Sequence, residues 1–197
     1  MRELNSVQEK ILDKTLLLIS KNGSSSVSIR AIAKEAEVNV SAINYYFRSK
    51  DELLREVKEF YMKNTLAAYA TLDRLDLEDE ERLLLTCNEI MEYTLRYPGI
   101  MVILKEAQEH KEEDTLSNEI IKITEEMNHK LELCLFKVIG KDKHTNNRKS
   151  TIFFSSLLYP VVNHSFFIFP HLNLADKAER LKYISSIIYL LKIPMEE

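Results

Sequence analysis

The stretch SIRAIAKEAEVNVSAINYYFRSKDELL, residues 28–54, determines how the N-terminal part of this chain is expected to fold. It contains two short segments with apolar residues at helical spacing. Ser28 stands before the first segment and Asn39 before the second, and both residue types favour helix N-termini. Glu37 and Val38 form a short turn between the two segments. This spacing predicts a helix-turn-helix.

Capping signals on either side extend this unit. The run SVQE at residues 6–9 is a capping box that opens a first helix, and Gly23 is placed to end it. A second capping box, SKDE at residues 49–52, opens a longer helix that the pattern continues toward residue 74. Three short capped helices followed by a long one predict a compact helical head over residues 1–55.

The rest of the chain is also predicted to be helical. Helices are expected at about 79–97, 100–108, 115–139, 147–169 and 174–192. The sequence has only 3 glycines and 4 prolines, which leaves few turns for hairpins and argues against β and α/β folds. We therefore predict an all-α protein, with a larger antiparallel helical domain over residues 56–197. Pro160 lies inside a predicted helix and is expected to kink it.

Charge and cysteine content are compatible with a cytoplasmic DNA-binding protein. The net charge is −4, but residues 1–55 hold nine Lys or Arg against seven Asp or Glu, and the remainder holds 18 against 24. The N-terminus lacks the apolar stretch of a secretory signal, and the apolar runs are too interrupted to span a bilayer, so no membrane partner is expected. Cys87 and Cys134 fit free thiols in a reducing cytosol, with a regulatory dithiol as the alternative.

The second helix of the predicted pair leaves an exposed face with small residues, hydrogen-bonding tips and no acidic group. Its members are Val40, Ser41, Ala42, Asn44 and Tyr45. A helix of this size fits the DNA major groove, where such tips can contact base edges. We expect these residues to read the sequence of a double-stranded DNA operator.

Phosphate groups call for helix N-termini, hydroxyls and cations. The segment provides Ser28, Asn39, Tyr46 and Lys50. Each of the last three has an alternative: Asn39 is first a cap, Tyr46 is as readily a packing residue, and Lys50 alone would be a solvated charge. Phe47 lies on the apolar face and is expected in the core.

The segment resembles the signature of the TetR family of transcriptional regulators. In that signature a Ser/Thr-Ile-Arg-x-Ile-Ala opening leads through Ala-Gly-Val-Ser to a Tyr-Tyr-x-Phe-x-x-Lys-x-x-Leu close, and the matched block covers roughly residues 7–58. The resemblance implies that the second helix of the pair is the recognition helix and that Ser28, Tyr46 and Lys50 contact the DNA backbone. It also implies a homodimer formed through the two C-terminal helices and a small-molecule effector.

Three positions depart from the family pattern. Glu37 stands where glycine is usual in the turn, and a left-handed backbone there is costly for a residue with a side chain. Ser41 replaces a common glycine near the helix start. Asn44 replaces a common tyrosine that touches phosphate, and it could instead reach a base, since asparagine pairs bidentately with adenine. These changes bear on the contact list and the operator sequence rather than on the fold.

The apolar segment 151–169 has three interpretations: ordinary core, dimer interface or pocket wall. A helix that is apolar on most sides must bury more than one face. The resemblance favours assigning its outward positions to a dimer seam. The last helix is expected to contribute Leu181, Ile184, Ile188 and Leu191 to this seam.

A small, largely apolar effector is expected to bind in the 75–170 region. Such pockets are lined mainly by apolar groups with a few polar ones. The candidate wall residues are Cys87, Met91, Ile103, Met127, Phe154, Asn163, His164 and Phe167. Asn163 and His164 have an alternative role as hydrogen-bonded polar groups of the core.

Nothing in the sequence indicates catalysis. It contains no glycine-rich phosphate loop, no Gly-x-Ser-x-Gly elbow and no His-Glu-x-x-His pair, and its five histidines lack metal-ligand spacing. We expect no enzyme activity, no cofactor and no metal. The leading hypothesis is a repressor released from its operator by the effector, with activation left open. The alternative is a helical interaction protein that retains the fold without sequence-specific DNA binding.

Overall fold

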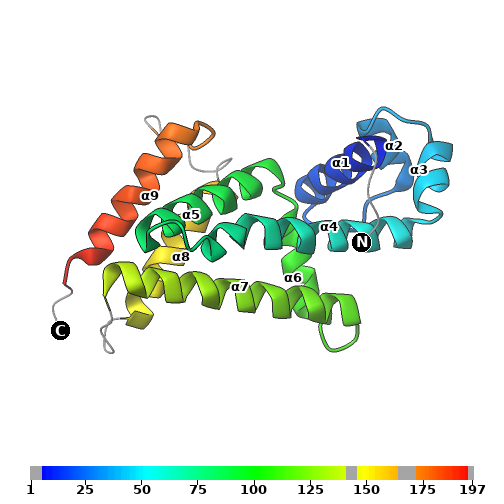
Figure 1. Ribbon diagram of the computed structural model, residues 1–197. Helices are drawn as coiled ribbons and strands as arrows, with labels where there is room; N and C mark the ends of the chain where they lie inside the picture. The colour runs from blue at the N-terminus through cyan, green and yellow to red at the C-terminus, as the bar shows by residue number, and fades with distance from the viewer. Residues whose placement is uncertain (1–5, 141–145, 164–171, 195–197) are drawn as a thin grey trace. The chain divides into compact units, whose positions relative to one another are not determined.

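The computed structural model describes residues 6–140, 146–163 and 172–194, and every regular element in these ranges is a helix (Figure 1). The elements are α1 (Ser6–Asn22), α2 (Ile29–Glu35), α3 (Val40–Phe47), α4 (Lys50–Tyr69), the 3₁₀ helix η1 (Ala70–Asp73), α5 (Asp79–Arg96), α6 (Ile100–His110), α7 (Thr115–Ile139), α8 (Asn146–Val162) and α9 (Lys177–Lys192). The predicted all-α class is confirmed. None of these helices is long and apolar enough to cross a membrane.

Three helix ends differ from the sequence prediction by more than two residues. The helix expected to continue toward residue 74 ends at Tyr69 and tightens into η1, as helix ends often do. The helix expected to reach residue 169 ends at Val162. The last helix begins at Lys177 rather than at residue 174. Asp176 caps it, since this carboxylate accepts a hydrogen bond from the backbone N–H of Glu179 at 3.0 Å.

The backbone packs as two compact units. The first comprises Met1–Asn64 and Tyr97–Thr124, and the second comprises Thr65–Arg96 and Glu125–Glu197. α4 and α7 therefore each contribute residues to both units. The domain boundary predicted after residue 55 stays a prediction.

The first unit contains the helix-turn-helix. α2 packs against both α1 and α3. Ile32 and Ala33 of α2 are buried, and so are Ile43 and Phe47 of α3. Burial of Ile43 and Phe47 leaves the opposite side of α3 in solvent.

Gly99 allows α6 to approach α1 within the same unit. A Cβ atom at this position would lie 2.1 Å from the carbonyl oxygen of Leu16. Any other residue would therefore push the two backbones apart. A hydrogen bond from the backbone N–H of Ser25 to Glu106 Oε1, 2.9 Å long, also ties the loop after α1 to α6.

The second unit has its own hydrophobic core. α5 packs against α8 and α9, and the C-terminal part of α7 adds further apolar side chains. Met91, Leu135, Phe153 and Ile184 are fully buried there.

Pro160 lies inside α8 and removes one helical hydrogen bond, because its nitrogen carries no proton to donate to the Ser156 carbonyl. The hydroxyl of Tyr183 on α9 donates to that oxygen instead, at 2.8 Å. Burial raises the pKa of Tyr183 above its ordinary value, so the phenol keeps the proton it donates.

Of the four residues predicted for the dimer seam on α9, Leu181 is half-buried and the other three are buried. Ile184, Ile188 and Leu191 are 0%, 1% and 5% exposed and form part of the core of their own chain, so assigning them to an outward seam is wrong. Helical periodicity marks an apolar stripe, but it does not say whether that stripe meets the same chain or another copy. The apolar side chains that stand exposed in this region are Ile152, Tyr159, Tyr189, Leu190 and Ile193.

Candidate DNA-binding surface

The turn between α2 and α3 is a Schellman motif. The backbone N–H of Val38 donates to the carbonyl of Ala33 at 3.0 Å. The N–H of Glu37 donates to the carbonyl of Lys34 at 3.2 Å. Glu37 occupies the left-handed position of this motif with a φ of 54°. The left-handed backbone considered from the sequence is therefore present, with a glutamate in place of the usual glycine.

The side chain of Glu37 links the turn to α1. Lys10 Nζ donates to Glu37 Oε2 at 3.0 Å. This hydrogen bond and charge lower the pKa of Glu37 below its ordinary value. The Glu37 side chain is 80% exposed, so solvent screens the pair and the turn depends mainly on its backbone bonds.

Side-chain caps fix the starts of α2 and α3, as the sequence predicted. Ser28 Oγ accepts from the backbone N–H of Ala31 at 3.1 Å. Asn39 Oδ1 accepts from the N–H of Ala42 at 2.7 Å and from the Ser41 hydroxyl at 2.6 Å. The proton of Ser41 is thus turned toward the cap, and its oxygen lone pairs remain available.

Four of the five predicted base-reading residues share the exposed face of α3. Val40, Ser41, Asn44 and Tyr45 are exposed, and Tyr45 is 81% exposed. Residues four positions apart stack on one side of a helix, so these four side chains form two adjacent pairs. Ala42 is half-buried beside them.

Three consecutive aromatic residues close α3. The rings of Tyr45 and Tyr46 meet edge to face with centroids 5.1 Å apart, and those of Tyr46 and Phe47 with centroids 6.5 Å apart. Phe47 is 2% exposed, which confirms its predicted place in the core. Tyr46 is half-buried between a solvent-exposed ring and a core ring. Packing and phosphate contact are therefore compatible roles for it.

α4 begins three residues after α3 ends, and its first residue, Lys50, carries a positive charge. The Ser49 hydroxyl caps the helix by accepting from the N–H of Glu52 at 3.1 Å. Lys50, the first residue of α4, is half-buried, and its ammonium makes no ion pair or hydrogen bond within the described residues. Its charge is therefore available to an anion.

The second unit gathers four of the predicted effector-pocket residues in one core. Cys87 and Met91 are fully buried on α5, and Met127 and Phe154 pack against the same core. Burial raises the pKa of the Cys87 thiol well above its ordinary value, so the thiol stays protonated. Ile103 is also buried, but it lies on α6 in the first unit.

Of the two polar residues predicted for the pocket, Asn163 and His164, the structure describes only Asn163. Asn163 Nδ2 donates to the carbonyl of Tyr159 at 3.1 Å, in an exposed hydrogen bond between α8 and the residue that follows it, so its predicted role stays a prediction. His164 and Phe167 lie outside the described residues. Across residues 6–140, 146–163 and 172–194, no group of three or more His, Cys, Asp or Glu is arranged to hold a metal ion.

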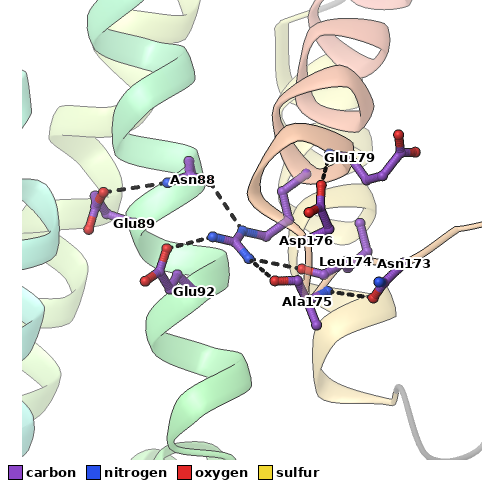
Figure 2. A network of polar contacts seen from close by, with 9 residues as sticks. Asn88, Glu89, Glu92, Asn173, Leu174, Ala175, Asp176 and Glu179 are labelled. Carbon is purple, nitrogen blue, oxygen red and sulfur yellow. Dashed lines mark hydrogen bonds and ion pairs between the residues drawn. The ribbon is translucent and has the colours of Figure 1, made fainter.

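Sequence reasoning missed a buried arginine on α9. Arg180 is 3% exposed, and its guanidinium donates to Asn88 Oδ1 at 3.1 Å and to Glu92 Oε2 at 2.5 Å (Figure 2). The same group donates to the carbonyls of Leu174 at 3.1 Å and Ala175 at 2.9 Å. The cluster joins α5, α9 and the segment that leads into α9.

A buried lysine was missed in the same way. Lys149 of α8 is 6% exposed, and its Nζ donates to the carbonyls of Leu191 at 2.7 Å and Ile193 at 3.2 Å. It thereby satisfies oxygens that the C-terminus of α9 leaves without helical partners. One signal was available: Lys149 and Arg180 each stand four residues before a core residue of the same helix, Phe153 and Ile184.

Comparisons with known sequences match the helix-turn-helix part of the chain. Residues 11–57 match the sequence model of the bacterial regulatory proteins, tetR family. The chain is 33% identical over 90 residues to the probable HTH-type transcriptional regulator YttP of Bacillus subtilis (strain 168), covering 45% of this chain and 44% of that one. It is 40% identical over 68 residues to the HTH-type transcriptional repressor KstR of Mycolicibacterium smegmatis, covering 32% and 33%. The matched segments span less than half the length of these curated relatives.

Solved structures match the fold over nearly the whole chain. The ketosteroid transcriptional regulator KstR2 of Mycobacterium tuberculosis matches with a TM-score of 0.73 and 16% identity, over 95% of both chains. A TetR-family transcriptional regulator from Bordetella parapertussis 12822 matches with a TM-score of 0.69 and 15% identity, over 93% of this chain and 95% of that one. At these identities the likeness concerns the fold.

Proposed function

We infer that this chain, which belongs to the TetR family of bacterial regulatory proteins, is a transcriptional regulator that binds double-stranded DNA through α3. The observation that carries this proposal is the exposed face of Val40, Ser41, Asn44 and Tyr45 on a capped helix without acidic side chains. Such a face suits the major groove, where base edges present donors, acceptors and methyl groups.

The residues around α3 are assigned to the DNA backbone. Ser28 and Asn39 cap α2 and α3, whose N-termini offer backbone N–H groups to phosphate oxygens. Lys50 provides a positive charge, and Tyr46 provides a hydroxyl. These contacts position the protein on DNA without selecting a sequence.

We propose that the regulator works as a homodimer formed through α8 and α9. Two of the exposed apolar residues there, Ile152 and Leu190, line a hollow of about 220 Å³. Its lining residues are Lys149, Ile152, Ser156, Ile187, Leu190 and Leu191. A second copy related by two-fold symmetry would cover this surface, and two heads about 34–36 Å apart would contact successive major grooves.

A small, largely apolar effector is proposed to release the dimer from its operator. The core that contains Cys87, Met91, Met127 and Phe154 supplies apolar walls of the kind such a molecule needs. Release requires the effector to bind better to a form in which the heads are wrongly spaced for DNA. α4 is proposed to carry the movement, because it contributes residues to both units.

The proposal makes the protein a repressor in the bacterial cytoplasm, where its operator would lie, and it assigns no enzyme activity to the chain. The curated relatives named above are likewise transcriptional regulators.

Selection of bound sequences from a random duplex library tests the proposal, using the purified chain at one fixed salt concentration. Enrichment of a two-fold symmetric site is the expected result. If folded, dimeric protein enriches no sequence, the chain is not a sequence-specific regulator. The helical interaction protein that keeps the fold without reading DNA would then be favoured.

A further inference from the structure

We propose that α3 reads A·T base pairs in each operator half-site and that Asn44 is the residue that selects adenine. This inference rests on the proposed DNA binding and adds to it the class of base pair that the helix recognises.

The recognition helix itself carries no cationic side chain. Val40–Phe47 contains no lysine and no arginine. Guanine presents two acceptors, N7 and O6, in the major groove, and arginine or lysine is the side chain that usually donates to both. α3 therefore lacks the group that most often selects G·C pairs.

Asn44 presents its side-chain amide on the exposed face of α3. It is exposed, and its side-chain amide makes no hydrogen bond to any residue that the structure describes. A carboxamide places a donor beside an acceptor, which matches the N7 acceptor and the N6 amino group of adenine. One turn earlier on the same face, Val40 is 38% exposed and offers the apolar surface that suits a thymine methyl group.

Ser41 adds a hydrogen-bond acceptor, and no free donor, to the same face of α3. Its hydroxyl donates to Asn39 Oδ1 at 2.6 Å, the oxygen that caps α3. With this proton engaged, Ser41 Oγ faces the groove as an acceptor. It can receive a hydrogen bond from the exocyclic amino group of adenine or of cytosine, and it does not donate to the N7 and O6 acceptors of guanine.

The nearby cations lie outside α3. Arg48 follows α3 as its C-cap with a φ of 63°, whereas recognition helices contact bases through their N-terminal residues. Arg30 and Lys34 lie on α2, the helix of such a pair that crosses the DNA backbone. Phosphate contacts carry no sequence information directly.

The test compares the sequences selected by the full chain and by its Asn44→Ala and Asn44→Arg variants at the same salt concentration. The wild type is expected to enrich adenine at one position of each half-site. Asn44→Ala should lower that preference by about 5- to 150-fold, the range of one bidentate contact. Asn44→Arg should move the preference at the same position from adenine to guanine, because arginine donates to both N7 and O6.

Lys50→Ala is the control for a contact without base readout. It should weaken binding to all sequences and leave the selected site unchanged. Circular dichroism and size-exclusion chromatography confirm that each variant is folded. A wild-type site with G·C pairs at these positions, or an unchanged preference in Asn44→Ala, would overturn this inference while DNA binding stands. A folded wild type that enriches no site would overturn the proposed function, and the inference with it.

Discussion

Glu37 combines a left-handed backbone, with φ at 54°, with a side chain. Glycine adopts this region without the steric cost of a Cβ atom. Glu37→Gly is therefore expected to raise Tm by about 2–4 °C, measured by calorimetry. Glu37→Ala is the control, because it also removes the pair with Lys10 but keeps the Cβ atom. An equal rise in both variants would show that backbone strain is not the source.

Asp114 makes the stability of the first unit depend on pH. Hydrogen bonds from Lys58 Nζ at 2.5 Å and from the Ser117 hydroxyl at 2.6 Å lower the pKa of Asp114 to about 2. An unfolded Asp titrates near pH 3.9, so the bonded carboxylate stabilises the fold above about pH 4. That contribution is lost as the pH falls from about 4 to about 2.

Asp114→Asn tests this dependence, since asparagine still caps α7 but carries no charge. The wild type is expected to unfold at a higher urea concentration than the variant at about pH 5, and this advantage should shrink toward about pH 2. A constant difference over the whole range would mean that the Asp114 charge is not the titrating group.

Among the helices, α5 and α9 are joined by the guanidinium of Arg180. Arg180→Met leaves the buried acceptors of Asn88 and Leu174 without a donor, and each such loss costs about 1–3 kcal/mol. The free energy of unfolding should therefore fall by at least about 2 kcal/mol in urea titration. Glu92→Gln should cost under about 1 kcal/mol, because this carboxylate is 54% exposed. Equal losses would place the stabilisation in the ion pair rather than in the buried acceptors.

The helices could be predicted where their signals are local. Ser28 and Asn39 bond to backbone groups three residues ahead, so one sequence is enough to place these caps. The exposed face of α3 follows from the same helical periodicity. The bond between Arg180 and Asn88 spans 92 positions, and periodicity does not say which buried polar groups meet. The assignment of Ile184 to the dimer seam failed for a related reason: Ile184 does lie on an apolar stripe, but that stripe packs within its own chain.

For the whole molecule, operator binding is expected to require two copies. In a two-fold dimer each interface residue occurs twice, so one substitution introduces two changes into the contact. Leu190 is 63% exposed on α9 and lines the hollow beside α8. Leu190→Asp would place a carboxylate from each copy in an apolar contact. We expect it to produce monomers, measured by light scattering after size exclusion.

Leu75→Asp is the matched control, because Leu75 is 86% exposed and precedes α5. It should remain dimeric. A monomer holds one half-site at a time, so Leu190→Asp should lose affinity for a full operator while its affinity for a single half-site is unchanged. If Leu190→Asp stays dimeric, the interface lies elsewhere on the chain. If the monomer binds the full operator as tightly as the wild type, then linkage of the two heads is not what holds the regulator on DNA, and an effector that changes their spacing could not release it.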